Sequence, residues 1–128
     1  MEILGNGVDI IQNSRIKKLI RNKKFIFRVF SKNEINESKK TKNKANFFAK
    51  RFAAKEAFVK SIGLGFRKGI NLNDICVHKD KLGKPNIVLN SKVKKVLSKK
   101  FSSNRFKIFL SLSDEKDYSI AYVILNKK

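Results

Sequence analysis

The hydrophobic pattern is clearest between residues 46 and 62, where it predicts one long amphipathic helix. Four apolar residues recur at the spacing of a single helical face: Phe48, Phe52, Val59 and Ile62. A second apolar strip beside them contains Phe47, Ala54 and Phe58. Gly63 and Gly65 follow the last of these residues, and glycine commonly ends a helix. We therefore expect a core helix that begins near Asn46 and ends near Gly63.

Shorter patterns on both sides of this helix predict strands and further helices. Strands are expected at residues 1–11, 74–80, 86–90, 106–113 and 118–125. Helices are expected over residues 13–22, after a capping box formed by Ser31 and Glu34, and from Ser91 onward. The Phe-rich segment 25–30 is expected to be a connection, and segments 39–44 and 66–69 loops. Together these elements indicate a single α+β domain, with a mostly antiparallel sheet wrapped on one long core helix.

Composition limits the class of protein. The 128 residues are 41% hydrophobic and include 11 Phe, which is enough for one domain with its own core. No apolar run approaches the length of a transmembrane helix, and the first residues lack a basic segment followed by an apolar one. The single cysteine, Cys76, excludes an internal disulfide and fits a reducing compartment. We expect a cytoplasmic protein without a membrane segment.

The formal net charge of +21 would attract a polyanionic partner such as nucleic acid, an acidic membrane or an acidic protein. The basic residues are mostly lysine and are spread along the whole chain, which resembles a general drift in composition as much as a selected binding surface. No helix-turn-helix, RNP or zinc-finger pattern is visible. A basic nucleic-acid-binding module is therefore kept as the alternative function.

Two acidic residues lie in otherwise apolar surroundings. Asp9 interrupts the first strand, and Glu56 lies on the shoulder of the core helix. A carboxylate near a packed face needs a partner, because desolvating a lone charge is costly. Lys60, at i+4 from Glu56, could form an ordinary surface ion pair with it. Alternatively, Asp9 and Glu56 could converge and hold Mg²⁺ together with phosphate oxygens.

Several segments resemble holo-[acyl-carrier-protein] synthases, the small, single-domain 4′-phosphopantetheinyl transferases. The segments occur in the order expected of that family and include Gly7-Val8-Asp9-Ile10, Arg51-Phe52-Ala53-Ala54-Lys55-Glu56-Ala57, Gly63-Leu64-Gly65 and Gly83-Lys84-Pro85. The resemblance covers essentially the whole chain, so it implies one transferase domain over residues 1–128. It also implies a role in fatty acid biosynthesis.

This resemblance implies a reaction and a metal. The 4′-phosphopantetheine group of coenzyme A would be transferred to a serine of acyl carrier protein, with release of 3′,5′-ADP. Asp9 and Glu56 would ligate Mg²⁺, and Lys60 would contact the phosphates. The serine proton would pass either to a metal-bound water or to Glu56, and the sequence leaves both bases open.

The resemblance also places residues around the nucleotide. They are Arg51, Lys55, Lys60, Gly63, Gly65, Pro85 and Ser111. One departure concerns the segment near the C-terminus, where many members carry a His-x-Ser-x-Ser/Thr-His pattern. Here Phe109 and Asp114 stand in place of the two histidines, while Ser111 and Ser113 remain. The 3′-phosphate would then need another contact, such as a nearby lysine.

Finally, the resemblance implies two kinds of partner. A basic surface formed by Arg15, Lys18, Arg21 and Arg28 would dock the acidic acyl carrier protein. Members of the family are usually homotrimers, with each active site between two subunits. A third possibility is an inactive relative that binds the carrier protein without modifying it.

Overall fold

The computed structural model describes residues 1–63 and 69–128. The strands are β1 (Glu2–Gln12), β2 (Ile75–Lys79), β3 (Pro85–Leu89), β4 (Phe106–Asp114) and β5 (Tyr118–Lys127). The helices are α1 (Asn13–Leu19), α2 (Lys23–Val29), α3 (Lys32–Ser38), α4 (Lys44–Ile62) and α5 (Ser91–Phe101), with a 3-10 turn at Leu72–Asp74. No described helix is long and apolar enough to cross a membrane.

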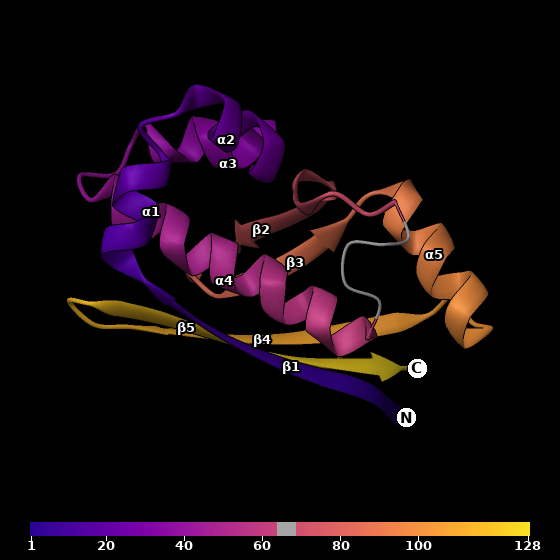
Figure 1. Ribbon diagram of the computed structural model, residues 1–128. Helices are drawn as coiled ribbons and strands as arrows, with labels where there is room; N and C mark the ends of the chain where they lie inside the picture. Colours follow the sequence, from indigo (N-terminus) through magenta and orange to yellow (C-terminus); the bar gives the residue numbers. More distant parts are fainter. Residues whose placement is uncertain (64–68) are drawn as a thin grey trace.

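The strands form two antiparallel sheets. The larger sheet has the order β1-β5-β4, and the smaller one is the hairpin β2-β3 (Figure 1). Helix α4 crosses one face of the larger sheet, and no other described element covers the opposite face in this view. The expected α+β fold with antiparallel strands on one long core helix is confirmed, although the strands divide into two sheets.

Helix α4 is central because most of its surface is apolar and buried. Phe48, Phe58, Val59 and Ile62 are each at most 2% exposed. The sheet contributes inward-facing residues at every second position, such as Ala121, Val123 and Leu125 of β5. The helix begins at Lys44, two residues before the expected start, because the Asn43 side chain accepts a hydrogen bond from the Asn46 amide. Its end at Gly63, in the left-handed conformation, is as expected.

The segment expected to be a Phe-rich connection is a helix instead. Helix α2 covers residues 23–29 because the Asn22 side chain caps the Lys24 amide, while Phe25 and Val29 lie one turn apart and are buried. The helix expected over residues 13–22 ends earlier, at Leu19. The capping box of Ser31 and Glu34 is present as predicted.

A buried charged pair ties this helical region to the core. Lys55 of α4 and Glu34 of α3 are both inaccessible to solvent, and the Lys55 ammonium lies 2.5 Å from the Glu34 carboxylate. The same ammonium donates to the carbonyl oxygens of Leu72 and Ile75, at 3.0 and 2.6 Å. Glu34 in turn accepts from the Val77 amide. Because both charges have several partners, burial does not leave either one unsatisfied.

Strand β1 approaches α4 closely at two glycines. A Cβ atom at Gly7 would overlap the carbonyl oxygen of Ala57, and one at Gly5 would overlap that of Ser61. The contact is therefore backbone against backbone, and neither side can yield without moving a whole element. The absence of side chains at these two positions fixes how near β1 lies to the helix.

We predict that Gly7→Ala destabilises the protein by at least about 1–3 kcal/mol, because the added methyl group must push β1 away from α4. Urea unfolding monitored by circular dichroism measures this change as a lower midpoint. Lys95→Ala, at an exposed position of α5, is the control and should cost under about 0.5 kcal/mol. Equal midpoints for Gly7→Ala and the unaltered protein would contradict the steric argument.

Candidate active site

Asp9 reaches α4 because it faces the same side of β1 as Gly7 and Ile11. The ammonium of Lys60 lies 3.0 Å from an Asp9 carboxylate oxygen and donates at the same distance to the carbonyl oxygen of Val8. The Asp9 side chain is 15% exposed, whereas that of Lys60 is 54% exposed. Lys60 therefore bridges the strand and the helix at the edge of the core, where solvent or a ligand can reach its ammonium group.

Glu56 supplies a second carboxylate beside this pair. Burial raises the pKa of Glu56, and repulsion from Asp9 raises it further, against the attraction of Lys60 and Arg15. No hydrogen bond or ion pair joins the Glu56 side chain to another residue within 1–63 or 69–128. The sequence had left open an ion pair between Glu56 and Lys60. In the structure Lys60 pairs with Asp9 instead, so Glu56 keeps its oxygen atoms available.

These two carboxylates have the chemistry of a Mg²⁺ site. Magnesium prefers oxygen ligands and is commonly held by one or two carboxylates, with waters and substrate phosphates completing its shell. The mutual repulsion of Asp9 and Glu56 would be relieved by a divalent cation. No group of three or more His, Cys, Asp or Glu residues among the described residues could hold a metal. Two carboxylates leave most of the coordination shell of the ion open, so the donor set fits a metal that shares its coordination with a phosphate substrate.

A second group of expected residues lies in a separate hollow of about 330 Å³ between the β2-β3 turn and β4. Pro85 and Ser111 both line it, as does Gly83. None of its lining residues belongs to the Asp9–Glu56–Lys60 cluster. Gly63 lies elsewhere again, at the end of α4, and Gly65 lies outside the described residues. Within one chain, the expected nucleotide-binding residues thus form more than one group.

Two lysines of this hollow were not singled out from the sequence. Lys50 of α4 and Lys79 of β2 line it together with Asp114, which lies 4.0 Å from the Lys50 ammonium. They offer the cations that a phosphate would need. Nothing in the sequence marked them, because lysine and arginine already account for 31 of the 128 residues.

Two of the expected nucleotide contacts are buried. Lys55 is fully enclosed and directs its ammonium at Glu34 and two backbone carbonyls, so it has no donor left for a ligand. Arg51 is 2% exposed, stacks on the Phe47 ring and lies 3.6 Å from Glu37. Both residues lie inside the core of the single chain, and their contact with the nucleotide stays a prediction. The Nε atom of the Arg51 guanidinium is buried and has no hydrogen-bond partner in the described chain.

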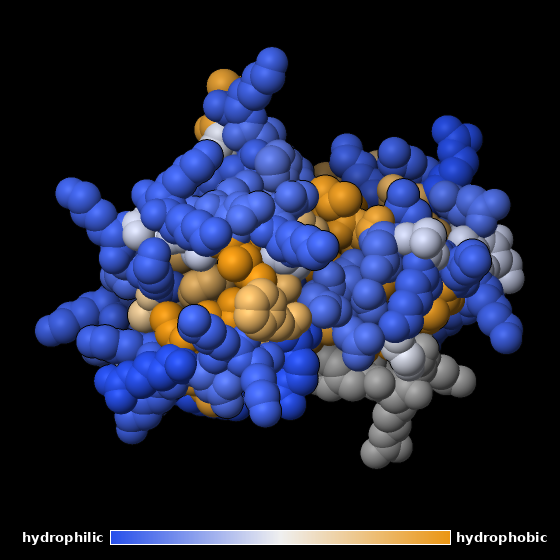
Figure 2. All heavy atoms as spheres, turned by 90° about the horizontal axis from the view of Figure 1, so that it is seen from above, coloured by the Kyte–Doolittle hydropathy of each residue, from blue (hydrophilic) through white to orange (hydrophobic). Residues whose placement is uncertain are grey.

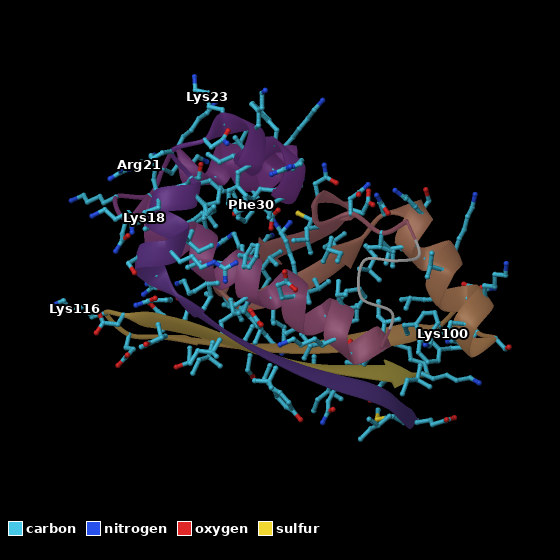
Figure 3. The ribbon with its side chains drawn as sticks, in the orientation of Figure 1. Lys18, Arg21, Lys23, Phe30, Lys100 and Lys116 are labelled. Atoms are coloured by element: carbon cyan, nitrogen blue, oxygen red, sulfur yellow. The ribbon has the colours of Figure 1, made fainter. Side chains whose placement is uncertain are left out.

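The four expected docking residues share one end of the molecule. Arg15 and Lys18 lie on α1, Arg21 follows it, and Arg28 lies on α2; all four side chains are exposed. Figure 3 shows Lys18 and Arg21 extending from this end, beside Lys23. The adjoining face in Figure 2 is covered largely by hydrophilic residues, with apolar side chains between them. Of the four, Arg15 attracts the Glu56 carboxylate and thereby opposes the rise in its pKa.

Comparisons with known proteins agree with these features. The sequence model of the 4′-phosphopantetheinyl transferase superfamily matches residues 5–123. A holo-[acyl-carrier-protein] synthase of Pelagibacter ubique is 58% identical over 128 residues, which is the whole of both chains. These matches favour the transferase interpretation over the nucleic-acid alternative.

Solved structures show the same relationship. The crystal structure of a holo-[acyl-carrier-protein] synthase from Neisseria meningitidis has a TM-score of 0.86 at 35% identity, covering 98% of this chain and 99% of that one. A synthase from Bacillus anthracis in complex with CoA (3′,5′-ADP) has a TM-score of 0.80 at 35% identity, covering 98% and 97% of the two chains. The chain thus belongs to the holo-[acyl-carrier-protein] synthase family of the 4′-phosphopantetheinyl transferase superfamily.

Proposed function

We propose that the protein transfers the 4′-phosphopantetheine group of coenzyme A to a serine of apo-acyl carrier protein and releases 3′,5′-ADP. The observation that carries this proposal is the cluster of Asp9, Glu56 and Lys60 at the contact between β1 and α4. Family membership and the complex of a related synthase with CoA (3′,5′-ADP) support the choice of substrates. The same reaction supplies holo-carrier protein for fatty acid biosynthesis.

In this proposal Asp9 and Glu56 hold Mg²⁺ and Lys60 binds the phosphates. The bound ion would stabilise negative charge on the pyrophosphate as the leaving group departs. The serine oxygen bonds to phosphorus, the bond from that phosphorus to 3′,5′-ADP breaks, and the serine proton must pass to a base. Glu56 and a water at the metal site are both candidate bases.

We predict that Asp9→Asn and Glu56→Gln each lower the transfer rate by roughly 100-fold or more, because each removes a charged oxygen ligand while keeping the shape of the side chain. Intact-mass spectrometry of apo-acyl carrier protein, incubated with coenzyme A and Mg²⁺, measures the added phosphopantetheine. Glu115→Gln, in the exposed turn before β5, is the control for loss of one carboxylate. Full activity in both site variants would rule out Asp9 and Glu56 as the metal ligands. If the unaltered protein binds the acyl carrier protein but the carrier gains no mass, the protein is an inactive relative.

The basic surface of Arg15, Lys18, Arg21 and Arg28 is proposed to dock the acyl carrier protein. Its cations form no ion pair with another described residue, so they remain available to an acidic partner. Such a surface raises the rate of encounter and orients the carrier serine toward the neighbouring site.

We predict that Lys18→Glu combined with Arg21→Glu raises the KM for acyl carrier protein about tenfold and changes kcat little, because these residues act in docking. Lys95→Glu reverses one charge at an exposed position of α5, away from the docking surface, and serves as a single-charge control. Rates measured at increasing salt should converge for the double variant and the unaltered protein. A double variant with unchanged KM at low salt would exclude this docking surface.

The uncovered face of the larger sheet supports assembly into a homotrimer. Its outward positions include five apolar or aromatic side chains that are 37–59% exposed, namely Val8, Ile10, Phe109, Ile120 and Tyr122, beside polar residues such as Asn6 and Ser111. Such a large apolar patch marks an interface. Because the Pro85–Ser111 hollow shares no residue with the Asp9–Glu56 cluster, we propose that each active site joins the cluster of one subunit to the hollow of the next.

We predict that Ile120→Lys converts the trimer to a monomer and abolishes transfer, because it places a charge at the centre of the uncovered face. Sedimentation velocity measures the mass, and the same sample is then assayed. Val88→Lys introduces a comparable change at an exposed apolar position of the smaller sheet and should remain trimeric. A monomeric Ile120→Lys protein with full activity would show that one chain contains the complete site.

A further inference from the structure

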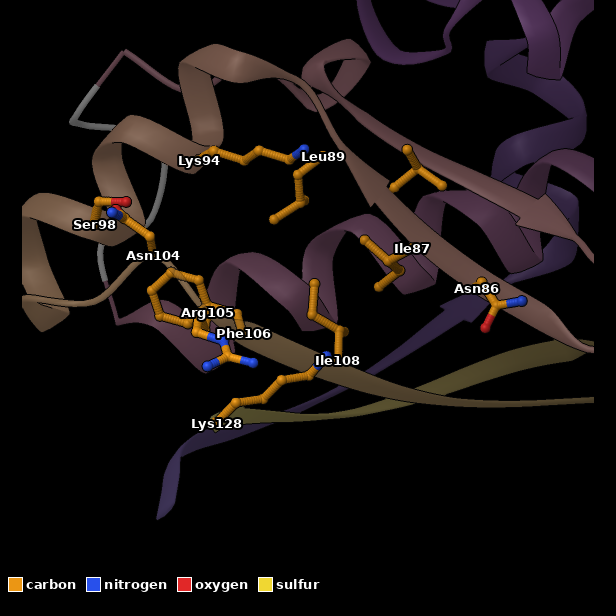
Figure 4. A pocket seen from close by; sticks show the side chains of 11 residues that line it. Asn86, Ile87, Leu89, Lys94, Ser98, Asn104, Arg105, Phe106, Ile108 and Lys128 are labelled. Carbon is orange, nitrogen blue, oxygen red and sulfur yellow. The ribbon is translucent and has the colours of Figure 1, made fainter. Parts of the chain in front are cut away.

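A larger pocket lies apart from the candidate active site, between β3, α5 and the start of β4. It has a volume of about 510 Å³, within the range of small-molecule sites. None of its lining residues belongs to the Asp9 cluster, the Pro85–Ser111 hollow or the docking surface. Its apolar lining comes chiefly from Ile87, Leu89, Phe106 and Ile108 (Figure 4).

Three cations from separate segments surround this apolar lining. Lys94 extends from α5, Arg105 immediately precedes β4, and Lys128 is the last residue of the chain. Figure 4 shows Lys94 on one side of the pocket and Arg105 and Lys128 on the other. None of the described lining residues has an acidic side chain, and none of the three cationic side chains forms an ion pair with a described residue. Lys92, two residues before Lys94 on the same helix, is by contrast paired with Asp74 at 3.2 Å.

The backbone around the cations is held in place. The amide of Lys128 donates to the carbonyl oxygen of Arg105 at 3.0 Å, so the two cationic residues are joined at the edge of the sheet. The Arg105 amide donates to the Ser103 hydroxyl at 3.2 Å. Helix α5 is anchored by Val93 and Leu97, both fully buried, which fixes the side from which Lys94 enters. The fold thus sets the backbone positions from which the three cationic side chains extend.

We propose that this pocket binds an aliphatic carboxylate, such as a free medium-chain fatty acid. The carboxylate would lie among Lys94, Arg105 and Lys128, since arginine and lysine bind carboxylates through charge-assisted hydrogen bonds. The alkyl chain would lie on the apolar part of the lining, formed by Ile87, Leu89, Phe106 and Ile108, where burial of each methylene is favourable. This inference rests on the pocket alone and is independent of the proposed transferase activity.

The first experiment titrates the full-length protein with decanoate, below the concentration at which decanoate forms micelles, and measures binding by calorimetry. Acetate carries the charge without the chain, and decanol carries the chain without the charge. We expect both to bind at least about tenfold more weakly than decanoate, because acetate lacks the buried alkyl chain and decanol lacks the carboxylate. Equal affinity for decanol and decanoate, or for acetate and decanoate, would overturn the proposal.

The second experiment locates the site. Arg105→Gln and Lys94→Gln should each weaken decanoate binding about tenfold, the loss expected for one charge-assisted hydrogen bond. Lys95→Gln is the matched control, because Lys95 neighbours Lys94 on α5 but does not line the pocket. Circular dichroism confirms that the variants fold. An equal loss of decanoate affinity in all three variants would indicate general attraction to a protein of net charge +21. Unchanged affinity in the two pocket variants would place the ligand elsewhere. Either result overturns the proposal.

Discussion

The close contact between β1 and α4 is the constraint on which the candidate site depends. Gly5 and Gly7 let the strand backbone meet the carbonyl oxygens of Ser61 and Ala57 directly. Asp9 faces the same side of the strand as Gly7, while Glu56 and Lys60 immediately precede the two helix residues in contact. The steric fit of two glycines therefore sets the separation of three charged groups. A larger residue at either glycine would change the distance from Asp9 to Glu56 and Lys60. It would thereby affect the reaction without contacting a reacting atom.

The buried pair of Lys55 and Glu34 has a different task, although Lys55 is adjacent to Glu56 in the sequence. Successive residues of a helix point about 100° apart, so one carries its charge into the core and the other carries it to the edge. Lys55 binds Glu34 and the carbonyls of Leu72 and Ile75, and thereby joins α3, the 3-10 turn and β2 to the core helix. Burial lowers the pKa of Lys55, against the attraction of Glu34. Removing either partner would leave an uncompensated charge inside the protein, which is more costly than losing a surface pair.

Much of the fold could be predicted from the sequence, because local signals agreed with the tertiary structure. The glycine at the end of α4, the Ser31–Glu34 capping box and the two C-terminal strands are examples. Helix α2 was missed because its only starting signal is the single asparagine cap of Asn22. The burial of Lys55 was missed because lysine is rarely enclosed, and its partner Glu34 lies 21 residues away. The pairing of Lys60 with Asp9 rather than Glu56 depends on the approach of β1, which spacing along one helix does not contain.

The imbalance of charge makes the acidic residues more informative than the basic ones. The chain has 31 lysines and arginines but only 10 aspartates and glutamates, and five of these acids pair with a cation, including Asp9 with Lys60. Glu34, Glu37, Asp74 and Asp114 each do so, and those acids without an ion pair to a described residue are exposed, with one exception. The exception is Glu56, which is partly buried. In so basic a protein, a carboxylate kept off the surface and left without a described ion-pair partner is the feature that composition explains least. A bound divalent cation would give Glu56 the partner that the described residues do not provide. The same ion would also relieve the repulsion between Glu56 and Asp9.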